Sequence, residues 1–247
     1  MRLLTLDRGN STLDVMLHRD DGASTRLRLV PADSLDLGTF LGADQPDAAV
    51  GLSTVPSGLD GLRARLLGRG LCVMLAGQDL PCPIPTRYRD PRTLGVDRWV
   101  GALAAFERFG AALTVDCGTA LTVNAIAADG TFLGGVIAPG ARSLARGLAR
   151  VAPALPEADP RRAGLPGLPA TTSQDAVDAG VVLGFVGLVE RLTTEVAQAA
   201  GLSGVPLVLT GGEAPLVLAH GRLGFEHVDD LVHQGLRCLW RRHLSRS

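Results

Sequence analysis

The sequence predicts an α/β protein made of two related lobes, with mixed sheets flanked by helices, and three observations predict it. Short apolar segments rich in Leu and β-branched residues alternate with helical patterns along the chain. Residues 4–15 (LTLDRGNSTLDV) and 113–124 (LTVDCGTALTVN) repeat one pattern, in which two apolar segments flank Asp-x-Gly and a small hydroxyl residue. Finally, 46% of the 247 residues are hydrophobic, which is enough to bury a substantial core.

The strand-like segments follow one another in two series, and a predicted helix separates the series. They are residues 3–7, 15–18, 48–55 and 71–76 before that helix, and 112–116, 121–127, 133–139 and 206–212 after it.

Two helices are predicted from apolar residues at helical spacing. Residues 95–109 place an apolar face next to Asp97 and Arg98 in the opening turn. Residues 173–200 repeat apolar positions at the same period and stop at Gly201. Between them, residues 151–172 are rich in Pro, Gly and Ala, which predicts a long surface loop. The expected lobes are residues 1–112 and 113–247.

Composition excludes several classes of protein. All 24 basic residues are Arg, so the chain lacks the Lys that a Walker A phosphate loop requires. The net charge of −1 provides no basic field for nucleic acid. Four widely spaced Cys residues are typical of free thiols in a reducing compartment. The N-terminus does not resemble a signal peptide, and no apolar run approaches a membrane span, so a cytoplasmic protein is expected.

The two Asp-x-Gly turns allow two interpretations. Either copy alone is typical of an ordinary hairpin. A tight Gly turn between strands also exposes backbone N–H groups and small hydroxyls, which suit phosphate oxygens, while the Asp suits a cation. Asp7 and Gly9 in the first copy parallel Asp116 and Gly118 in the second, and a third glycine turn (LTGG) occupies 209–212. The repetition favours phosphate binding.

These turns resemble those of the actin, sugar kinase and Hsp70 superfamily, whose two lobes have a ribonuclease H-like fold. Within it the chain resembles the type III pantothenate kinases over nearly its whole length. The carrying motifs are DRGNS (7–11), STVP (53–56), YRDPRTLGVDR (88–98), VDCGTALTVNAI (115–126), FLGGVIAPG (132–140) and LTGG (209–212).

The resemblance implies phosphorylation of pantothenate to 4'-phosphopantothenate by ATP with Mg²⁺, the first step toward coenzyme A. It implies that Asp97 is the general base and that Asp116 binds a monovalent cation, K⁺ or NH₄⁺. It implies a first ATP loop comprising Asp7, Arg8, Gly9, Asn10, Ser11, Thr12, Leu13 and Asp14, with Thr119 as a contact from the second turn. Without the resemblance, Asp97 would be interpreted as a helix cap, and Asp7 and Asp116 would be interpreted as turn residues.

Pantothenate contacts are implied for Tyr88, Gly95, Val96, Asp97, Arg98 and Ser173. In the family a Thr near the start of the long helix reaches the pantothenate of the neighbouring subunit, which implies a homodimer. Ser173 occupies that place here, although Thr172 with Asp175 also approximates a capping box. Neither nucleic acid nor membrane is expected as a partner.

The first loop departs from the family at Arg8, Ser11 and Asp14. Some relatives carry Lys at the position of Asp14. An extra carboxylate near the triphosphate weakens ATP binding unless it faces away or meets a cation. Two other functions stay open: an accessory transcription regulator of the same fold, and a kinase or phosphatase for another substrate. The intact Asp97 and both turns favour pantothenate kinase.

Overall fold

The computed structural model describes residues 1–29, 36–160 and 165–245, and the chain forms two compact units. Unit 1 contains Met1–Arg108 together with Asp230–Ser247, and unit 2 contains Phe109–Asp229. The first boundary lies close to the expected one at residue 112. The C-terminal segment, which was expected in the second lobe, falls in unit 1 because its helix packs on the first sheet.

Unit 1 contains a five-stranded mixed sheet in the order β3-β2-β1-β4-β5. Strands β1, β2 and β3 are antiparallel, whereas β4 and β5 run parallel to β1. The strands are β1 (Leu3–Arg8), β2 (Leu13–His18), β3 (Ser24–Leu29), β4 (Ala48–Ser53) and β5 (Cys72–Leu75). The helices are α1 (Leu37–Leu41), α2 (Asp60–Leu67), the 3-10 turn η1 (Pro91–Thr93), α3 (Val96–Phe109) and α7 (Leu231–Leu244).

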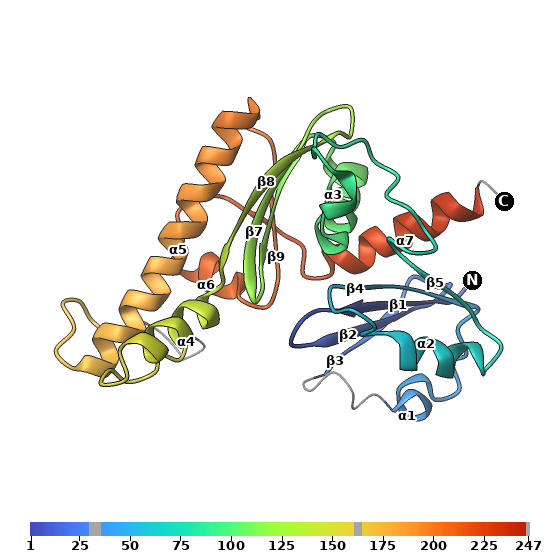
Figure 1. The fold of residues 1–247 in the computed structure, drawn as a ribbon, viewed down its shortest axis with the longest axis horizontal. Coiled ribbons are helices and arrows are strands. Elements are labelled where there is room, and N and C mark those ends of the chain that lie inside the picture. Colours follow the sequence, from blue (N-terminus) through green and yellow to red (C-terminus); the bar gives the residue numbers. More distant parts are fainter. Residues whose placement is uncertain (30–35, 161–164, 246–247) are drawn as a thin grey trace. The chain divides into compact units, whose positions relative to one another are not determined.

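Helices cover both faces of this sheet (Figure 1). Successive side chains of a strand point to opposite faces, so Leu4 and Leu6 enter a core that also contains Leu37 of α1 and Leu66 of α2. The opposite face carries Thr5, and α7 packs against it. The face below α7 is the more polar one.

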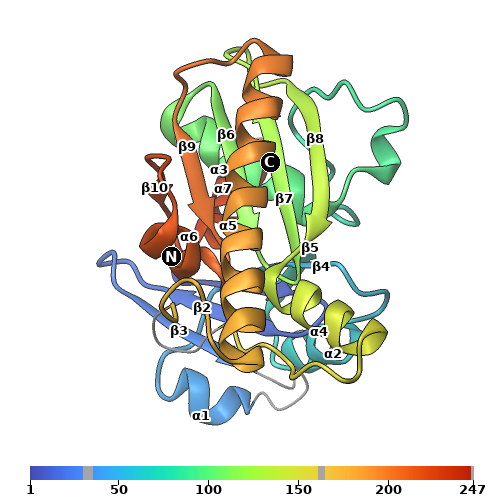
Figure 2. The same cartoon turned by 90° about the vertical axis from the view of Figure 1, so that its left-hand side faces the viewer.

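Unit 2 contains a second mixed sheet in the order β10-β9-β6-β7-β8. Its strands are β6 (Ala112–Cys117), β7 (Ala120–Ile126), β8 (Phe132–Pro139), β9 (Leu207–Thr210) and β10 (Glu226–His227). Its helices are α4 (Ala141–Val151), α5 (Ser173–Ala200) and α6 (Ala214–His220). Figure 2 shows α5 running along one face of this sheet, where Phe185 and Val189 enter the core.

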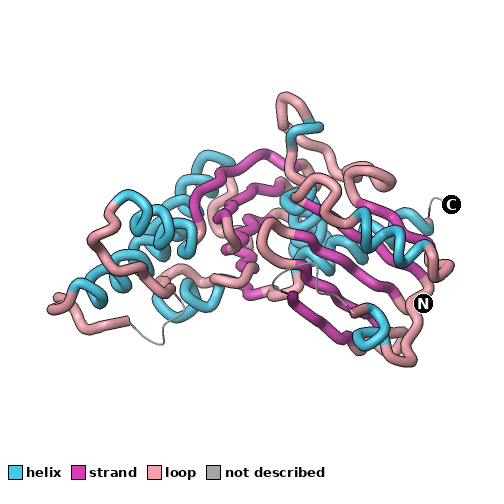
Figure 3. Tube along the Cα trace, turned by 60° about the horizontal axis from the view of Figure 1, so that its bottom comes forward, coloured by secondary structure: helices cyan, strands magenta, loops and turns pink. Residues whose placement is uncertain are grey.

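The two sheets have the same topology. In each, the first strand pairs antiparallel with the second and parallel with the fourth, so β1 corresponds to β6 and β4 to β9. Figure 3 distinguishes the strands of both sheets from the surrounding helices. Asp7 and Asp116 are each the last residue but one of the first strand of their sheet. The prediction of two related lobes with mixed sheets is therefore confirmed.

The two predicted helices are confirmed as α3 and α5. Gly201 ends α5 with a left-handed backbone (φ 66°), a conformation that Gly adopts without strain. The described part of the predicted loop at 151–172 contains no helix or strand after Val151, which is the last residue of α4. Strand β3 was not predicted from the sequence. Among the described residues, no helix has the length and apolarity needed to cross a membrane.

Candidate functional site

The first glycine turn joins β1 to β2 in unit 1. Asn10 and Ser11 are exposed at its tip, whereas the Leu13 side chain is buried in the core. The Arg8 guanidinium folds back onto its own turn and donates to the carbonyl oxygens of Gly9 and Thr12. Arg8 thus braces the turn, and the polar residues at its tip are exposed.

Asp7 lies at the base of this turn in an environment of several charges. Burial raises the pKa of Asp7 to about 6, and the neighbouring carboxylates of Asp14 and Asp97 also raise it. The charges of His233 and Arg28 oppose that shift. Asp7 and the candidate base Asp97 therefore lie close enough to interact electrostatically within unit 1.

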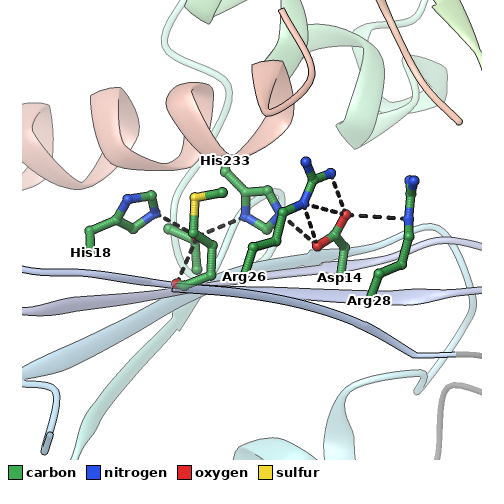
Figure 4. A network of polar contacts seen from close by, with 7 residues as sticks. Asp14, His18, Arg26, Arg28 and His233 are labelled. Atoms are coloured by element: carbon green, nitrogen blue, oxygen red, sulfur yellow. Dashed lines mark hydrogen bonds and ion pairs between the residues drawn. The ribbon is translucent and has the colours of Figure 1, made fainter. Parts of the chain in front are cut away.

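Asp14 is buried at the centre of a polar network (Figure 4). Arg26 donates to both of its carboxylate oxygens, from Nη2 at 2.6 Å and from Nε at 3.0 and 3.1 Å. Arg28 Nε lies 3.4 Å from Oδ2, and His233 Nε2 lies 3.4 Å from Oδ1. Although burial alone would raise it, the nearby His233 and the hydrogen bonds from Arg26 hold the pKa of Asp14 well below its usual range. The extra carboxylate of the first loop therefore meets cations.

The same network continues through the other ring nitrogen of His233, Nδ1. The Thr5 hydroxyl lies 2.7 Å from His233 Nδ1 and 2.9 Å from His18 Nε2. Burial lowers the pKa of His18 to about 4, and the charges of Arg237 and His233 act in the same direction. Helix α7 is thereby fixed to the polar face of the first sheet.

Asp97 occupies the first turn of α3. Burial raises the pKa of its carboxyl, although that group accepts hydrogen bonds from the backbone N–H groups of Arg98 and Asp97 itself. A Cβ at Gly95 would lie 2.8 Å from Asp97 Oδ1, so glycine gives the carboxylate room at the start of the helix. The carboxylate contacts the helix terminus, and it also lies within electrostatic reach of Asp7.

The implied pantothenate residues Tyr88 and Arg98 contact one another. Arg98 Nη1 donates to the Tyr88 hydroxyl, and the guanidinium carbon lies 5.6 Å from the centre of the Tyr88 ring. Arg98 is buried, with 6% of its surface exposed. These two residues and Asp97 form one cluster at the beginning of α3, next to the partly exposed Val96.

The second glycine turn, in unit 2, lies against the LTGG turn. Asp116 of β6 is the direct partner of Thr210 in β9. A Cβ at Gly211 would lie 2.4 Å from Asp116 Oδ1 and 2.6 Å from the Cys117 carbonyl oxygen. Gly211 also has a positive φ of 94°, so this close approach requires glycine for two reasons. Carboxylate and carbonyl oxygens converge here, and oxygen ligands suit a hard cation.

Glu213 holds the remaining parts of the second turn together. Its buried carboxylate accepts from the backbone N–H of Ala141 at 2.6 Å and that of Arg142 at 3.1 Å, at the start of α4. Its own N–H donates to the Cys117 carbonyl at 2.8 Å. Burial, together with Asp116 and Glu213, raises the pKa of the Cys117 thiol well above its usual range, so this thiol stays protonated. Thr119, also implied as a phosphate contact, is exposed at the tip.

Ser173 begins α5 and lines an apolar groove of about 670 Å³ between α4 and α5. The Thr172 hydroxyl accepts from Asp175 N–H at 3.1 Å and donates to the Asp175 carboxylate at 2.9 Å. The Thr172 hydroxyl therefore caps α5, as the capping-box pattern predicts, and the Asp175 carboxylate contacts that hydroxyl. Thr172 and Ser173 are both exposed.

The charged partners that surround both turns were not predicted from the sequence. Arg26 and Arg28 lie on β3, His233 comes from α7, and Glu213 follows β9. The sequence does contain a pattern that indicates the strand carrying Arg26 and Arg28, because these residues alternate with Leu27 and Leu29 in a period of two. No local pattern connects His233 with the first turn, which lies more than two hundred residues earlier in the chain.

Solved structures show which known folds resemble this one. The fold is similar to that of a conserved putative Baf family transcriptional activator from Campylobacter jejuni, with a TM-score of 0.61, 19% identity and coverage of 98% of this chain and 99% of that one. It is also similar to that of a putative 2-dehydro-3-deoxygalactonokinase from Sinorhizobium meliloti, with a TM-score of 0.56, 16% identity and coverage of 98% and 99%. The fold is that of the actin-like and sugar kinase proteins.

Sequence comparison then gives the family. The family model described as type III pantothenate kinase matches residues 3–195, and the chain belongs to this family. The type III pantothenate kinase of Nocardia farcinica is 33% identical over 99% of this chain and 98% of its own length. That of Anaeromyxobacter dehalogenans is 38% identical over 69% of this chain and 66% of its own length, slightly under two thirds of that relative.

Proposed function

We propose that this protein transfers the γ-phosphoryl group of ATP to the primary hydroxyl of pantothenate and so forms 4'-phosphopantothenate, the first intermediate toward coenzyme A. Membership of the family supports this activity. The structural observation that carries it is the position of Asp97, a partly buried carboxylate that interacts electrostatically with Asp7 at the base of the first turn. Phosphoryl transfer depends on such positioning of the acceptor against the phosphate more than on covalent chemistry by the protein.

Asp97 is the proposed general base. It would accept the proton of the pantothenate hydroxyl as that oxygen attacks the γ-phosphorus and the bond to the β–γ bridging oxygen breaks, with ADP leaving. A carboxyl whose pKa is raised by burial is a better proton acceptor than an exposed one, because the optimal pKa of a base lies near the working pH. Arg98 and Tyr88, which contact each other beside it, are proposed to bind the substrate. Gly95 and Val96 would complete that wall, and a guanidinium suits the pantothenate carboxylate.

The first turn, Asp7 to Asp14, is the proposed site of the ATP phosphates, with Thr119 as the contact from the second turn. The exposed tip residues of the first turn support this assignment, as does the convergence of oxygen atoms around Gly211 in the second. Mg²⁺ would enter with ATP and help to neutralise the phosphate charge. Asp116 is the proposed ligand of a monovalent cation, K⁺ or NH₄⁺, and its oxygen-rich surroundings fit such an ion.

A homodimer is proposed through the face of α4 and α5. The groove there is lined by Leu144, Leu148, Val177 and Val181, and apolar surface of this kind is typical of interfaces. In a twofold arrangement each subunit would present the same face, and Ser173 at its edge would reach the pantothenate of the partner. A cytoplasmic location is proposed because a metabolic kinase acts where ATP and its substrate are dissolved.

The likeness to the Campylobacter jejuni protein concerns the fold alone at 19% identity, so it does not favour the alternative of a transcription regulator. The test of the proposed function is an assay of the purified protein with ATP, Mg²⁺ and pantothenate, with K⁺ present or replaced by Na⁺. Formation of 4'-phosphopantothenate, faster with K⁺, is expected. Absence of phosphorylated product at millimolar ATP would overturn the proposal.

A further inference from the structure

Three charged residues form a straight row across the first sheet. Asp7 in β1 is the direct partner of Asp14 in β2, and Asp14 is the direct partner of Arg28 in β3. Direct partners in an antiparallel ladder project to the same face and lie within contact distance of one another. Arg28 is the last residue but one of β3, and β3 ends on the same side as the first turn.

The equivalent row in unit 2 differs in charge. There Asp116 pairs with Thr122, and Thr122 pairs with Ile137 in β8. The two sheets share one topology, so Asp14 and Arg28 occupy the places of Thr122 and Ile137. Ile137 is 64% exposed, which indicates that the third position of such a row is open. At these equivalent positions the first sheet therefore carries a carboxylate and an arginine, both next to the turn that the proposed function assigns to phosphate.

The two arginines that hold Asp14 are bound to it in different ways. Arg26 makes a bidentate contact with the carboxylate, and 22% of its side chain is exposed. Arg28 approaches through Nε at 3.4 Å, and 44% of its side chain is exposed. A guanidinium carries five N–H donors, so a contact through Nε leaves the planar fork of terminal nitrogens that matches a phosphate group.

Electrostatics assign complementary roles to these residues. One positive charge of Arg26 is sufficient to balance the negative charge of Asp14. The charge of Arg28 extends to Asp7, whose pKa it lowers, so it acts at the base of the first turn. The row therefore brings a cation to that turn in a chain in which all 24 basic residues are Arg.

We propose that Arg28 binds the phosphate chain of the nucleotide and that Asp14, at the end of the proposed ATP turn, belongs to this site as a positioning residue, which orients Arg28 and does not itself contact the nucleotide. This inference rests on the proposed function, since it concerns the same ATP site. It adds a binding residue on β3, a strand that the first loop motif does not include. It also gives the carboxylate in that loop a role compatible with a negatively charged ligand.

The test measures binding of ATP and of adenosine to the full chain by isothermal titration calorimetry, with the variants Arg28→Gln and Arg28→Lys. Loss of one charge-assisted hydrogen bond to phosphate is expected to weaken ATP binding by about ten- to a hundredfold. Adenosine lacks phosphate, so its affinity is expected to stay within twofold. Arg28→Lys keeps the charge without the fork and is expected to recover part of the ATP affinity.

The matched control is Arg63→Gln, which removes the guanidinium of another partly exposed Arg–Asp pair, Arg63 with Asp79 at 3.0 Å in unit 1. It is expected to leave both affinities unchanged. An ATP affinity unchanged in Arg28→Gln overturns the proposal, and so does an equal loss for ATP and adenosine, which would indicate a structural role. Thermal unfolding of each variant confirms that the folded chain is being compared.

The outcomes separate this inference from the proposed function. If pantothenate is phosphorylated but Arg28→Gln binds ATP normally, Arg28 is excluded and the proposed function stands. If ATP binding depends on Arg28 but pantothenate is not phosphorylated, Arg28 is supported and the proposed function fails. A wild-type protein that binds no ATP contradicts both.

Discussion

Gly235 of α7 lies directly against the backbone carbonyl of Val100 in α3, and a Cβ at Gly235 would stand 2.1 Å from that oxygen. The two helices therefore approach as closely as their backbones permit. This contact fixes α7, which carries His233, against α3, which carries Asp97. Gly235 has no reactive side chain, but its close packing helps to position His233 and Asp97 in the candidate site of unit 1.

Replacement of Gly235 by Ala is expected to destabilise the protein, because the added methyl group meets rigid backbone. Overpacking of this kind costs about 1–3 kcal/mol. Gly147→Ala in α4 is the control, since nothing lies within 4 Å of its added Cβ. Ala is favoured over Gly inside a helix by about 0.5–1 kcal/mol, so the control should be neutral or more stable. Urea unfolding of the three proteins measures the difference, and a Gly235→Ala protein as stable as wild type contradicts the packing described.

Replacement of Asp97 by Asn is expected to lower kcat by about 10²- to 10⁴-fold, the typical contribution of a general base. The KM for ATP should change little, because Asp97 is proposed to act on the acceptor hydroxyl. Only the ionised carboxylate accepts a proton, and burial raises its pKa, so wild-type activity is expected to fall as the pH is lowered and Asp97 becomes protonated.

Steady-state assays of Asp97→Asn and of Asp175→Asn test this assignment, since Asp175 takes part in the cap at the start of α5. An Asp97→Asn protein with more than a tenth of wild-type kcat would remove Asp97 from the role of base.

The pH dependence of stability should carry a contribution from His18. Its folded pKa is about 4 against an ordinary value of 6.5, so between these values the unfolded chain binds more protons than the folded one. The contribution of His18 is therefore complete above pH 6.5 and is lost as pH falls toward 4, by about 3 kcal/mol in total.

Because Asp7 and Asp14 also titrate, the His18 contribution is read from the difference between wild type and His18→Gln. The slope of unfolding free energy against pH between 4 and 6.5 should be smaller in the variant. His227→Gln, at an exposed position on β10, should keep the wild-type slope. Equal slopes for wild type and His18→Gln would contradict the burial of an uncharged imidazole beside Thr5.

The proposed dimer is tested by Gly184→Glu. Gly184 lines the groove between α4 and α5, and its added Cβ would meet nothing within 4 Å, so the subunit should still fold. A charge in the middle of an apolar interface is expected to shift the protein to monomers and to raise the KM for pantothenate, because Ser173 would no longer reach the partner's site. Light scattering after gel filtration measures the oligomeric state of the variant.

Gly147→Glu on α4, outside the residues that line the groove, is the control for this experiment. A Gly184→Glu protein that remains dimeric would place the subunit interface elsewhere. A wild-type protein that is a fully active monomer would contradict both the dimer and the role of Ser173.

The sequence by itself determined the repeated units and predicted the main elements of the candidate site. Apolar periodicity is a local property, so α3, α5 and most strands could be identified, and Asp7 and Asp116 were recognised as equivalent from the repeated Asp-x-Gly pattern. Family motifs identified the cluster that begins α3, including Asp97 and Arg98. Glycine turns and helix caps depend on a few neighbouring residues, which is why the Thr172–Asp175 cap was also foreseen.

Only the tertiary structure decided which distant residues surround these groups. The return of α7 to the first sheet brings His233 to Asp14, and the pairing of β3 with β2 brings Arg28 beside it. Glu213 meets the start of α4 across 71 and 72 positions of the chain. Such contacts arise from sheet order and helix packing, which bury several elements at once, and no period within a single segment of the sequence encodes them.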